Sequence, residues 1–275
     1  MDKLSIDKGL SHSSSDLELE EVSVGFFTSC IVDIFRPSVG FSSLRLLEDA
    51  GCKVEVPELQ ACCGQPTYNR GDTLGAMAVA RQVISVFEQF DYVIVPSGSC
   101  AGMIREHYPR LFMTDLYWLE RARRLSEKTY ELTQFLVDIL KIQKVDTELN
   151  GVCTYHDSCS SKRELGIDLQ PRKLLSSVKG LEIQEMKDTS ECCGFGGLFC
   201  MKYPDISTHM VANKVKNIAA TQADILVGGD LGCLFNIGGF LERSGKIFQI
   251  FHVAEVLAGV IDGPVNLELE KLDDG

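Results

Sequence analysis

Short apolar runs alternate with longer amphipathic segments along the chain from Val22 onward. Runs of four to six residues that are apolar or alternate in polarity are typical of buried strands. The strand-like runs are residues 24–27, 53–57, 92–95, 152–155, 181–186 and 224–227. Between them, apolar residues recur near the helical period. The predicted helices are residues 37–50, 72–90, 171–178 and 204–221. Strands that alternate with helices of this length predict an α/β fold with mainly parallel sheets.

The order of these elements occurs twice, which predicts two similar α/β domains, residues 22–145 and 151–262. In each, a mainly parallel sheet is flanked by helices. A long stretch rich in Arg, Glu and Leu, Trp118 to Lys144, predicts a helix that closes the first half and leads into a linker at 146–151. Part of it, 129–140, resembles 247–257 near the end of the chain.

Residues 1–21 are rich in Ser, Asp and Glu and predict a disordered leader, while residues 263–275 form an acidic tail. The leader lacks the apolar core of a secretion signal and the Arg-rich character of a transit peptide. No run approaches the roughly 18 to 20 apolar residues of a membrane span. A net charge of −12 argues against a nucleic-acid partner, which requires a basic surface. We therefore expect a soluble cytoplasmic protein.

Eight of the eleven cysteines form a duplicated frame. Each copy contains a Cys-Cys-Gly motif, with one cysteine behind an apolar run upstream and another behind an apolar run downstream. The steps between cysteines are 32, 1 and 37 residues in the first copy and 33, 1 and 40 in the second. The two sets are Cys30, Cys62, Cys63 and Cys100, and Cys159, Cys192, Cys193 and Cys233. Because ligand sites of open α/β sheets lie at the carboxyl ends of strands, we expect each set to meet on loops there.

An odd number of cysteines in a chain without a secretion signal favours metal binding over disulfides. Four converging thiolates suit an iron–sulfur cluster or tetrahedral zinc. Structural zinc usually uses two Cys-x-x-Cys knuckles, and neither set contains one. Cys52 and Cys153 are expected to be buried, inert thiols, and Cys200 either a packed thiol or a ligand. Two roles stay open for His156: a metal ligand, or a structural residue held by hydrogen bonds. His252 is expected at the start of a helix.

The paired motifs resemble the cysteine-rich CCG-domain proteins, which include the B subunit of heterodisulfide reductase and the iron–sulfur subunit of glycolate oxidase. Residues 155–159, 191–197 and 232–237, with Gly98-Ser99-Cys100, are most similar to the lactate utilization protein A family. The resemblance covers about residues 22 to 260. The wider family often ends each motif in Cys-x-x-Cys, whereas Met103 and Asn236 stand at that last position here. Four cysteines per set then favour a cubane [4Fe-4S] cluster, or one with a non-thiolate ligand, in each domain, and zinc at one site stays open.

The resemblance implies a role in the oxidation of L-lactate to pyruvate, as an iron–sulfur subunit of a multi-protein oxidoreductase. Its partners would be a ferredoxin-like iron–sulfur subunit and a third protein of the lactate utilization system. The sequence assigns no catalytic residue. The alternatives are a redox subunit like those of heterodisulfide reductase or glycolate oxidase, and a zinc-stabilised scaffold without redox activity.

Overall fold

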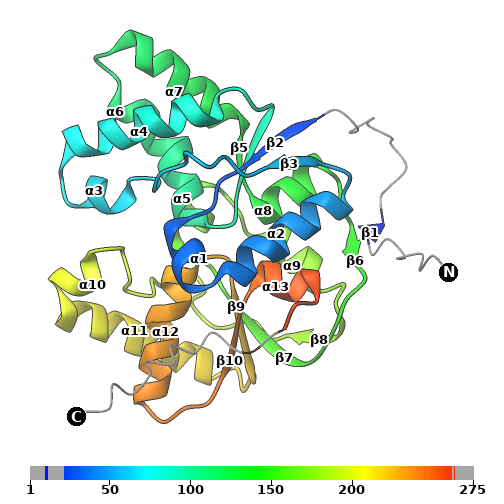
Figure 1. Cartoon of the computed structure of the whole chain (residues 1–275). Helices are drawn as coiled ribbons and strands as arrows, with labels where there is room; N and C mark the ends of the chain where they lie inside the picture. Colours follow the sequence, from blue (N-terminus) through cyan, green and yellow to red (C-terminus); the bar gives the residue numbers. More distant parts are fainter. Residues whose placement is uncertain (1–9, 12–21, 262, 264–275) are drawn as a thin grey trace, which may run out of the picture.

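Two parallel four-stranded sheets form the centres of the two halves (Figure 1). The computed structural model describes residues 10–11, 22–261 and 263. The first sheet contains β2 (Ser23–Phe26), β3 (Lys53–Glu55), β4 (Tyr92–Val95) and β5 (Thr129–Glu131). The second contains β7 (Glu148–His156), β8 (Lys179–Ile183), β9 (Ile225–Gly228) and β10 (Gln249–His252). The interior strands β4 and β9 are largely apolar, as expected for strands covered on both faces.

The two sheets have the same topology. Their strand orders are β3-β2-β4-β5 and β8-β7-β9-β10, so the strands correspond in chain order. The register agrees as well, since Val24 pairs with Tyr92 in the first sheet and Cys153 with Ile225 in the second. The predicted fold class, two similar α/β units with parallel sheets, is confirmed. The exact limits 22–145 and 151–262 stay predictions.

Helices connect the strands and cover both sheets, and the helices predicted at residues 37–50, 72–90, 171–178 and 204–221 are present. Asp72 caps the longest helix of the first half by accepting a hydrogen bond from Gly75 N, as residues of this type do at N-caps. The helices of the first half are α1 (Cys30–Phe35), α2 (Pro37–Asp49), α3 (Gln65–Asn69), α4 (Thr73–Phe87), α5 (Gly98–Gly102) and α6 (Tyr108–Leu111). Those of the second are α9 (Leu169–Leu175), α10 (Phe199–Lys202), α11 (Pro204–Ala219), α12 (Leu231–Arg243) and α13 (Val253–Ala258). Short π-helical segments, η1 (Met103–His107) and η3 (Ser160–Glu164), follow two of the cysteines.

The single long helix predicted over Trp118 to Lys144 is wrong. The segment forms α7 (Leu116–Lys128), strand β5, α8 (Leu132–Gln134), the π-helix η2 (Phe135–Ile139) and the short strand β6 (Lys144–Val145). The β-branched and aromatic pair Thr129-Tyr130 favours an extended backbone, and β5 gains a ladder with β4. The linker is also shorter than expected, because β7 begins at Glu148.

The last helical segment of each half packs against a helix of the other half. Helix α13 packs against α2, and α8 and η2 pack against α9, as Figure 1 shows. One hydrophobic cluster therefore contains residues of both halves, including Leu47 and Val256. A partly buried ion pair joins the same elements, with Arg36 Nε 2.8 Å from Glu255 Oε1. The shared core holds the carboxyl ends of the two sheets in a defined arrangement.

The predicted leader and tail lie mostly outside the described residues. The exceptions are Leu10–Ser11, which form β1 and pair antiparallel with β6, and Gly263, whose carbonyl accepts a hydrogen bond from Arg36.

Candidate metal centres

The structure brings the eight predicted cysteines together in two groups of four at the carboxyl ends of the two sheets. Cys30, Cys62, Cys63 and Cys100 form what we call the first centre, and Cys159, Cys192, Cys193 and Cys233 the second. Only the Cys-Cys-Gly pairs lie on loops. The other four cysteines occupy the first turn of the helix that follows a strand, as Cys30 does in α1 and Cys233 in α12. Helix N-termini favour thiolates, because their free N–H groups and dipole stabilise negative charge.

Thiol contacts run through the first centre as an unbroken chain. Cys30 Sγ lies 3.7 Å from Cys62 Sγ, and Cys63 interacts with both Cys62 and Cys100. The hydrogen bond from Cys30 lowers the pKa of Cys62, and the same bond raises the pKa of Cys30. The lowered pKa of Cys62 favours its thiolate, the form that binds metals.

The second centre repeats this chain. Cys192 interacts with Cys159 and Cys193, and Cys193 with Cys233. The interaction with Cys159 lowers the pKa of Cys192, the counterpart of Cys62. Backbone N–H groups of Gly194 and Phe195 donate to the sulfurs of Cys192 and Cys193 at 3.4 and 3.5 Å. A loop that turns tightly through glycines with positive φ directs these N–H groups back at the thiols.

Each Cys-Cys-Gly loop is also anchored by a side chain from the helix behind it. Tyr108 Oη donates to the carbonyl of Cys63 at 2.8 Å, and Asn236 Nδ2 donates to the carbonyl of Cys193 at 2.8 Å. Asn236 stands where the wider family often has a further cysteine, and its amide is committed to the loop backbone. Met103, at the matching position of the first half, is fully buried in the core.

The first centre surrounds a space larger than a single ion needs. All four of its cysteines line one cavity of about 180 Å³, many times the roughly 10–15 Å³ that a cavity needs to hold one water molecule. Four thiolates on one zinc ion would lie about 3.8 Å from one another, given Zn–S bonds of about 2.3 Å. Among the described residues, no three ligand atoms of the first centre all lie within 4.8 Å of one another. The donor set fits a cluster of several metal ions with bridging sulfides.

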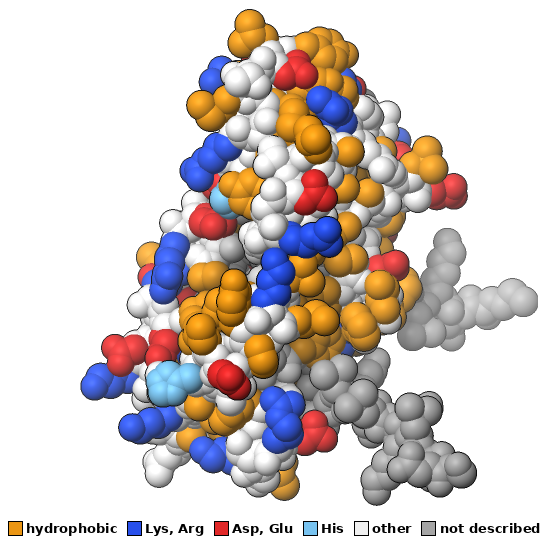
Figure 2. Space-filling view, turned by 90° about the vertical axis from the view of Figure 1, so that its left-hand side faces the viewer, with side chains coloured by type: hydrophobic (Ala, Val, Ile, Leu, Met, Phe, Trp, Pro, Cys, Tyr) orange, Lys and Arg blue, Asp and Glu red, His pale blue; other side chains and the backbone are white. Residues whose placement is uncertain are grey.

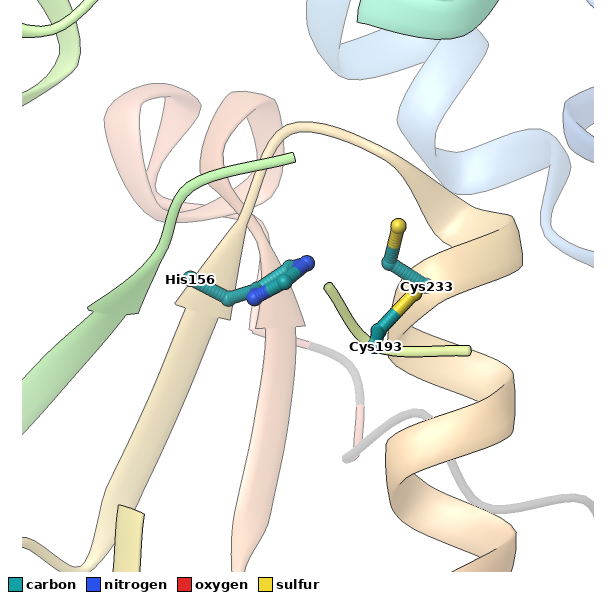
Figure 3. Close-up of side chains that lie close together, drawn as sticks. All are labelled: His156, Cys193 and Cys233. Atoms are coloured by element: carbon teal, nitrogen blue, oxygen red, sulfur yellow. The ribbon is translucent and has the colours of Figure 1, made fainter. Parts of the chain in front are cut away.

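The second centre contains a more compact group. His156, Cys193 and Cys233 place one ligand atom each within 4.8 Å of one another, and all three residues are buried. Figure 3 shows the His156 ring at the end of its strand, turned toward the two cysteines. It is the one such group found in the described part of the chain.

His156 is buried in an unusual state. Neither ring nitrogen has a hydrogen-bond partner among the described residues. Leaving a buried polar group unpaired costs about 1–3 kcal/mol. Burial and the neighbouring Lys214 lower the pKa of His156 to about 3, so its imidazole is neutral at physiological pH. A neutral imidazole is the form that ligates metals.

Lys214 is a residue that the sequence interpretation missed. Its side chain is fully buried in α11, and its Nζ donates to the carbonyl of Thr189 at 2.9 Å. Burial lowers its pKa, and it lies close enough to Cys193 and Cys233 to interact electrostatically. The position of Lys214 in the sequence could have indicated its burial, because it falls on the apolar face of the helix that Val211, Val215 and Ile218 define.

The segment that carries His156 and Cys159 is fixed by a buried ionic network. Both terminal nitrogens of Arg172 lie 2.9 Å from the carboxylate oxygens of Asp157, and Lys162 lies 3.3 Å away. Burial would raise the pKa of Asp157, but its bonds with Arg172 and Lys162 outweigh burial and lower it. The first half holds the matching segment differently, through a 2.8 Å hydrogen bond from Thr28 N to Gln60.

The remaining cysteines lie outside the two groups. Cys52 and Cys153 are buried in the core, and burial raises the pKa of these thiols to about 11 and about 12. Cys200 is half-buried, and its thiol donates to the carbonyl of Gly197 at 3.5 Å. The expected helix-entry role of His252 is confirmed, because its Nδ1 accepts a hydrogen bond from Ala254 N at the start of α13.

The two centres open to solvent through different mouths. A cavity of about 370 Å³ beside Cys30 and Cys62 is lined by polar and acidic residues, including Asp33 and Glu58. A cavity of about 460 Å³ beside Cys192 is lined by Phe199, Met210 and other apolar residues, with Lys202 at its edge. Figure 2 shows hydrophobic side chains interleaved with Lys and Arg on the face that carries α10. The exposed hydrophobic residues of α10 and the start of α11 are Met201, Tyr203 and Ile206.

A family model described as a cysteine-rich domain, CCG, matches the chain twice, at residues 24–105 and 153–238. The chain is 48% identical over 234 residues to lactate utilization protein A of Geobacillus sp. (strain WCH70), which covers 85% of this chain and 98% of the relative. It is 47% identical, with the same coverage, to lactate utilization protein A of Bacillus cytotoxicus. The chain belongs to the lactate utilization protein A family. The resemblance inferred from the cysteine motifs is thus confirmed.

Comparison of solved structures adds support for the fold alone. A hypothetical protein from Helicobacter pylori superimposes with a TM-score of 0.63 at 10% sequence identity, over 88% of this chain and 49% of that protein. Within the residues that the structure describes, no helix of this family member is both long and apolar enough to cross a membrane.

Proposed function

We propose that this protein takes part in lactate utilization as the iron–sulfur subunit of a multi-protein system that oxidises L-lactate to pyruvate. Its relatives are named for lactate utilization. The observation that carries the redox assignment is the first centre, where four thiols line one cavity of about 180 Å³. The eleven free thiols suit a reducing, cytoplasmic compartment.

The residues present fit a cubane [4Fe-4S] cluster at each centre. Such clusters supply one-electron transfer, which neither a thiol nor a zinc ion provides. The protein's part is to bind, orient and shield. Thiolates of Cys62 and Cys192 are stabilised before binding by their neighbours. Phe195 and Leu198 of the second half line the cavity of the first centre and limit its contact with water.

The residues that line the same cavity favour oxidation of lactate on a partner protein. Lactate is an anion, and its carboxylate needs a cationic or strongly donating site. The cavity is lined by Asp230 and contains no Lys, Arg or His among its described lining residues. Asp230 is buried, and it accepts hydrogen bonds from Ser97 and Ser99, so its carboxylate faces the cavity region. We infer that electrons reach this chain from a ferredoxin-like subunit or the third protein of the system.

The test is a reduction experiment in three parts. L-lactate is added anaerobically to the reconstituted protein alone, to the protein with its two companion proteins, and to the companions alone, while visible absorbance is followed. We expect bleaching of this protein's clusters only when the companions are present. Bleaching of the isolated protein by lactate would show that this chain oxidises the substrate itself. No bleaching in the complete mixture, despite loaded clusters, would contradict the electron-carrier role.

A zinc-stabilised scaffold is the second candidate, because the compact group of His156, Cys193 and Cys233 suits a single ion. A heterodisulfide-reductase-like reaction is less well supported. In the family that reaction relies on a fifth cysteine, and the side chain at that position here, Asn236, donates to the carbonyl of Cys193 instead. Metal analysis separates the zinc scaffold from the redox subunit.

A further inference from the structure

The second centre contains a side chain that the cysteine frame does not account for. His156 is 1% exposed, ends strand β7, and presents its ring to Cys193 and Cys233 (Figure 3). Its ligand nitrogen and the two sulfurs all lie within 4.8 Å of one another. Bonds of about 2.0–2.3 Å from each donor can therefore reach a shared metal site with small side-chain adjustments.

Hydrogen bonding within the protein does not explain this histidine. A neutral imidazole has one N–H donor and one lone pair, and each needs a partner when buried. Within the described residues neither nitrogen has one. The nearby cation does not fill the gap, because the bond found for Lys214 Nζ runs to the carbonyl of Thr189 and neither His156 nitrogen has a partner among the described residues. A ring nitrogen that lies within 4.8 Å of two cysteine sulfurs is satisfied by a metal ion bound between them.

The first centre lacks this group. The residue three positions before its first cysteine is Phe27, which is fully buried and packs against Phe87 with ring centroids 5.5 Å apart. His156 stands three positions before Cys159, at the end of the corresponding strand. The two sheets share topology and register, so the comparison is between equivalent sites. The first centre has four thiols as donors, and the second has four thiols and an imidazole.

We propose that His156 is a metal ligand of the second centre, which makes it a mixed thiolate and imidazole site beside an all-thiolate first centre. The proposal rests on the proposed function only for the identity of the metal, an iron–sulfur cluster. The imidazole supplies the fifth donor that the side chain of Asn236 does not.

A mixed ligand set changes the electrostatics of the second centre. A neutral imidazole binds a metal without adding negative charge, and histidine ligation raises the potential of [2Fe-2S] centres of the Rieske type. Buried Lys214 acts in the same direction through its interactions with Cys193 and Cys233. We therefore expect the second centre to have the higher reduction potential and to hold the electron that the first centre passes on.

The experiment is X-ray absorption at the iron and zinc edges on anaerobically purified protein, which detects imidazole by its outer-shell scattering and identifies the metal that carries it. Three proteins are compared: wild type, His156→Phe, which copies the residue of the first half, and His209→Phe as control. His209 is exposed on α11 and does not belong to the compact group of ligand atoms. We expect imidazole scattering in the wild type and in His209→Phe, and its loss in His156→Phe.

Bound metal without imidazole scattering in the wild type would overturn the proposal, as would scattering that persists in His156→Phe. The result also separates this inference from the proposed function. Imidazole scattering at the zinc edge, with no iron in the protein, would support the ligand and contradict the redox role. Should His156→Phe fail to fold, His156→Cys supplies a second variant. It is expected to keep its metal, lose the imidazole signal and lower the midpoint potential of the second centre only.

Discussion

The two halves of the protein build the same cysteine group on the same sheet topology, yet they place different residues beneath it. Phe27 and Val83 lie under the first centre and are fully buried. His156 and Lys214 occupy the corresponding positions in the second half. The correspondence on the helices follows from the loop glycines, since a Cβ on Gly64 would contact Val79 and one on Gly194 would contact Met210. Val83 and Lys214 each lie four residues further along.

This difference separates what holds a metal from what sets its properties. The chain of thiol contacts, the loop glycines and the anchoring side chains are matched between the centres. The surroundings are apolar in one and contain a neutral imidazole and a buried amine in the other. If each centre holds a redox cluster, as we propose, the two clusters would differ in potential, and electron transfer between them would have a direction.

The largest expected effect comes from removing one central thiol in either half. We expect Cys62→Ser to lose the metal of the first centre and keep that of the second, and Cys192→Ser to do the reverse, because serine is a poor ligand for soft metals. Metal and sulfide analysis of each variant measures this. Cys200→Ser, outside both groups, is the control and should retain the full content. Full metal content in Cys62→Ser or Cys192→Ser would show that the groups are misassigned.

A second difference between the halves concerns the last residue of the fourth strand, Glu131 in β5 and His252 in β10. Burial raises the pKa of Glu131 from 4.5 to about 7, although Thr133 and Gln134 donate hydrogen bonds to its carboxylate. The unfolded chain therefore releases this proton at lower pH than the folded protein. The free energy of unfolding should therefore fall as pH rises from about 4.5 to about 7. The expected decrease is about 3 kcal/mol, at about 1.4 kcal/mol per pKa unit.

Urea unfolding at a series of pH values from about 5 to about 8 tests this prediction. Glu131→Gln keeps an oxygen acceptor but cannot ionise, so the decrease attributable to residue 131 should disappear. An identical pH dependence in wild type and Glu131→Gln would contradict the assignment.

The anchors of the two Cys-Cys-Gly loops allow a matched comparison of smaller effects. Tyr108→Phe and Asn236→Leu each leave a cysteine carbonyl without its side-chain donor, at a cost of about 1–3 kcal/mol. Tyr108 is fully buried whereas Asn236 is only half-buried, so water can replace the lost donor more easily at Cys193. We expect the larger loss of unfolding free energy for Tyr108→Phe. Equal or reversed losses would show that the anchors do not act as described.

The smallest effect should come from the buried amine. Lys214→Met removes a positive charge beside the second centre, and we expect a lower midpoint potential there with the first centre unchanged. Folding should tolerate the change, since a buried charge with a single carbonyl partner contributes little net stability. Potentiometric titration followed by EPR measures both midpoints, and Val83→Met is the matched control. A shift of both midpoint potentials, or of neither, would show that Lys214 does not set the potential of the second centre.

The sequence alone was enough for the frame of the molecule. The spacing of Cys30, Cys62, Cys63 and Cys100 and its repetition predict both groups, and apolar runs predict six of the eight sheet strands. Strand β5 was hidden because three residues, Thr129–Glu131, lie within a segment whose composition favours helix. Tertiary pairing with β4 overrides that local preference.

Other features depend on contacts that no local pattern contains. The amphipathic face of α13 predicts that it is buried, but not that it packs on α2 of the other half. A lysine in a helix is usually exposed, so burial of Lys214 could be recognised only once α11 was placed against the second centre. His156 left two interpretations open, and its ring nitrogens, which have no partner among the described residues and lie beside Cys193 and Cys233, favour the ligand.

The central claim is that two cysteine groups bind two redox clusters. It is tested most directly by measuring iron, labile sulfide and zinc per chain on anaerobically purified protein, with an EPR spectrum of the reduced sample. About eight iron and eight sulfide per chain, as two four-iron clusters require, with signals from two centres, is the predicted result. Zinc without sulfide, in protein never exposed to air, would mean that the cysteine groups are structural and that the electron-transfer account is wrong.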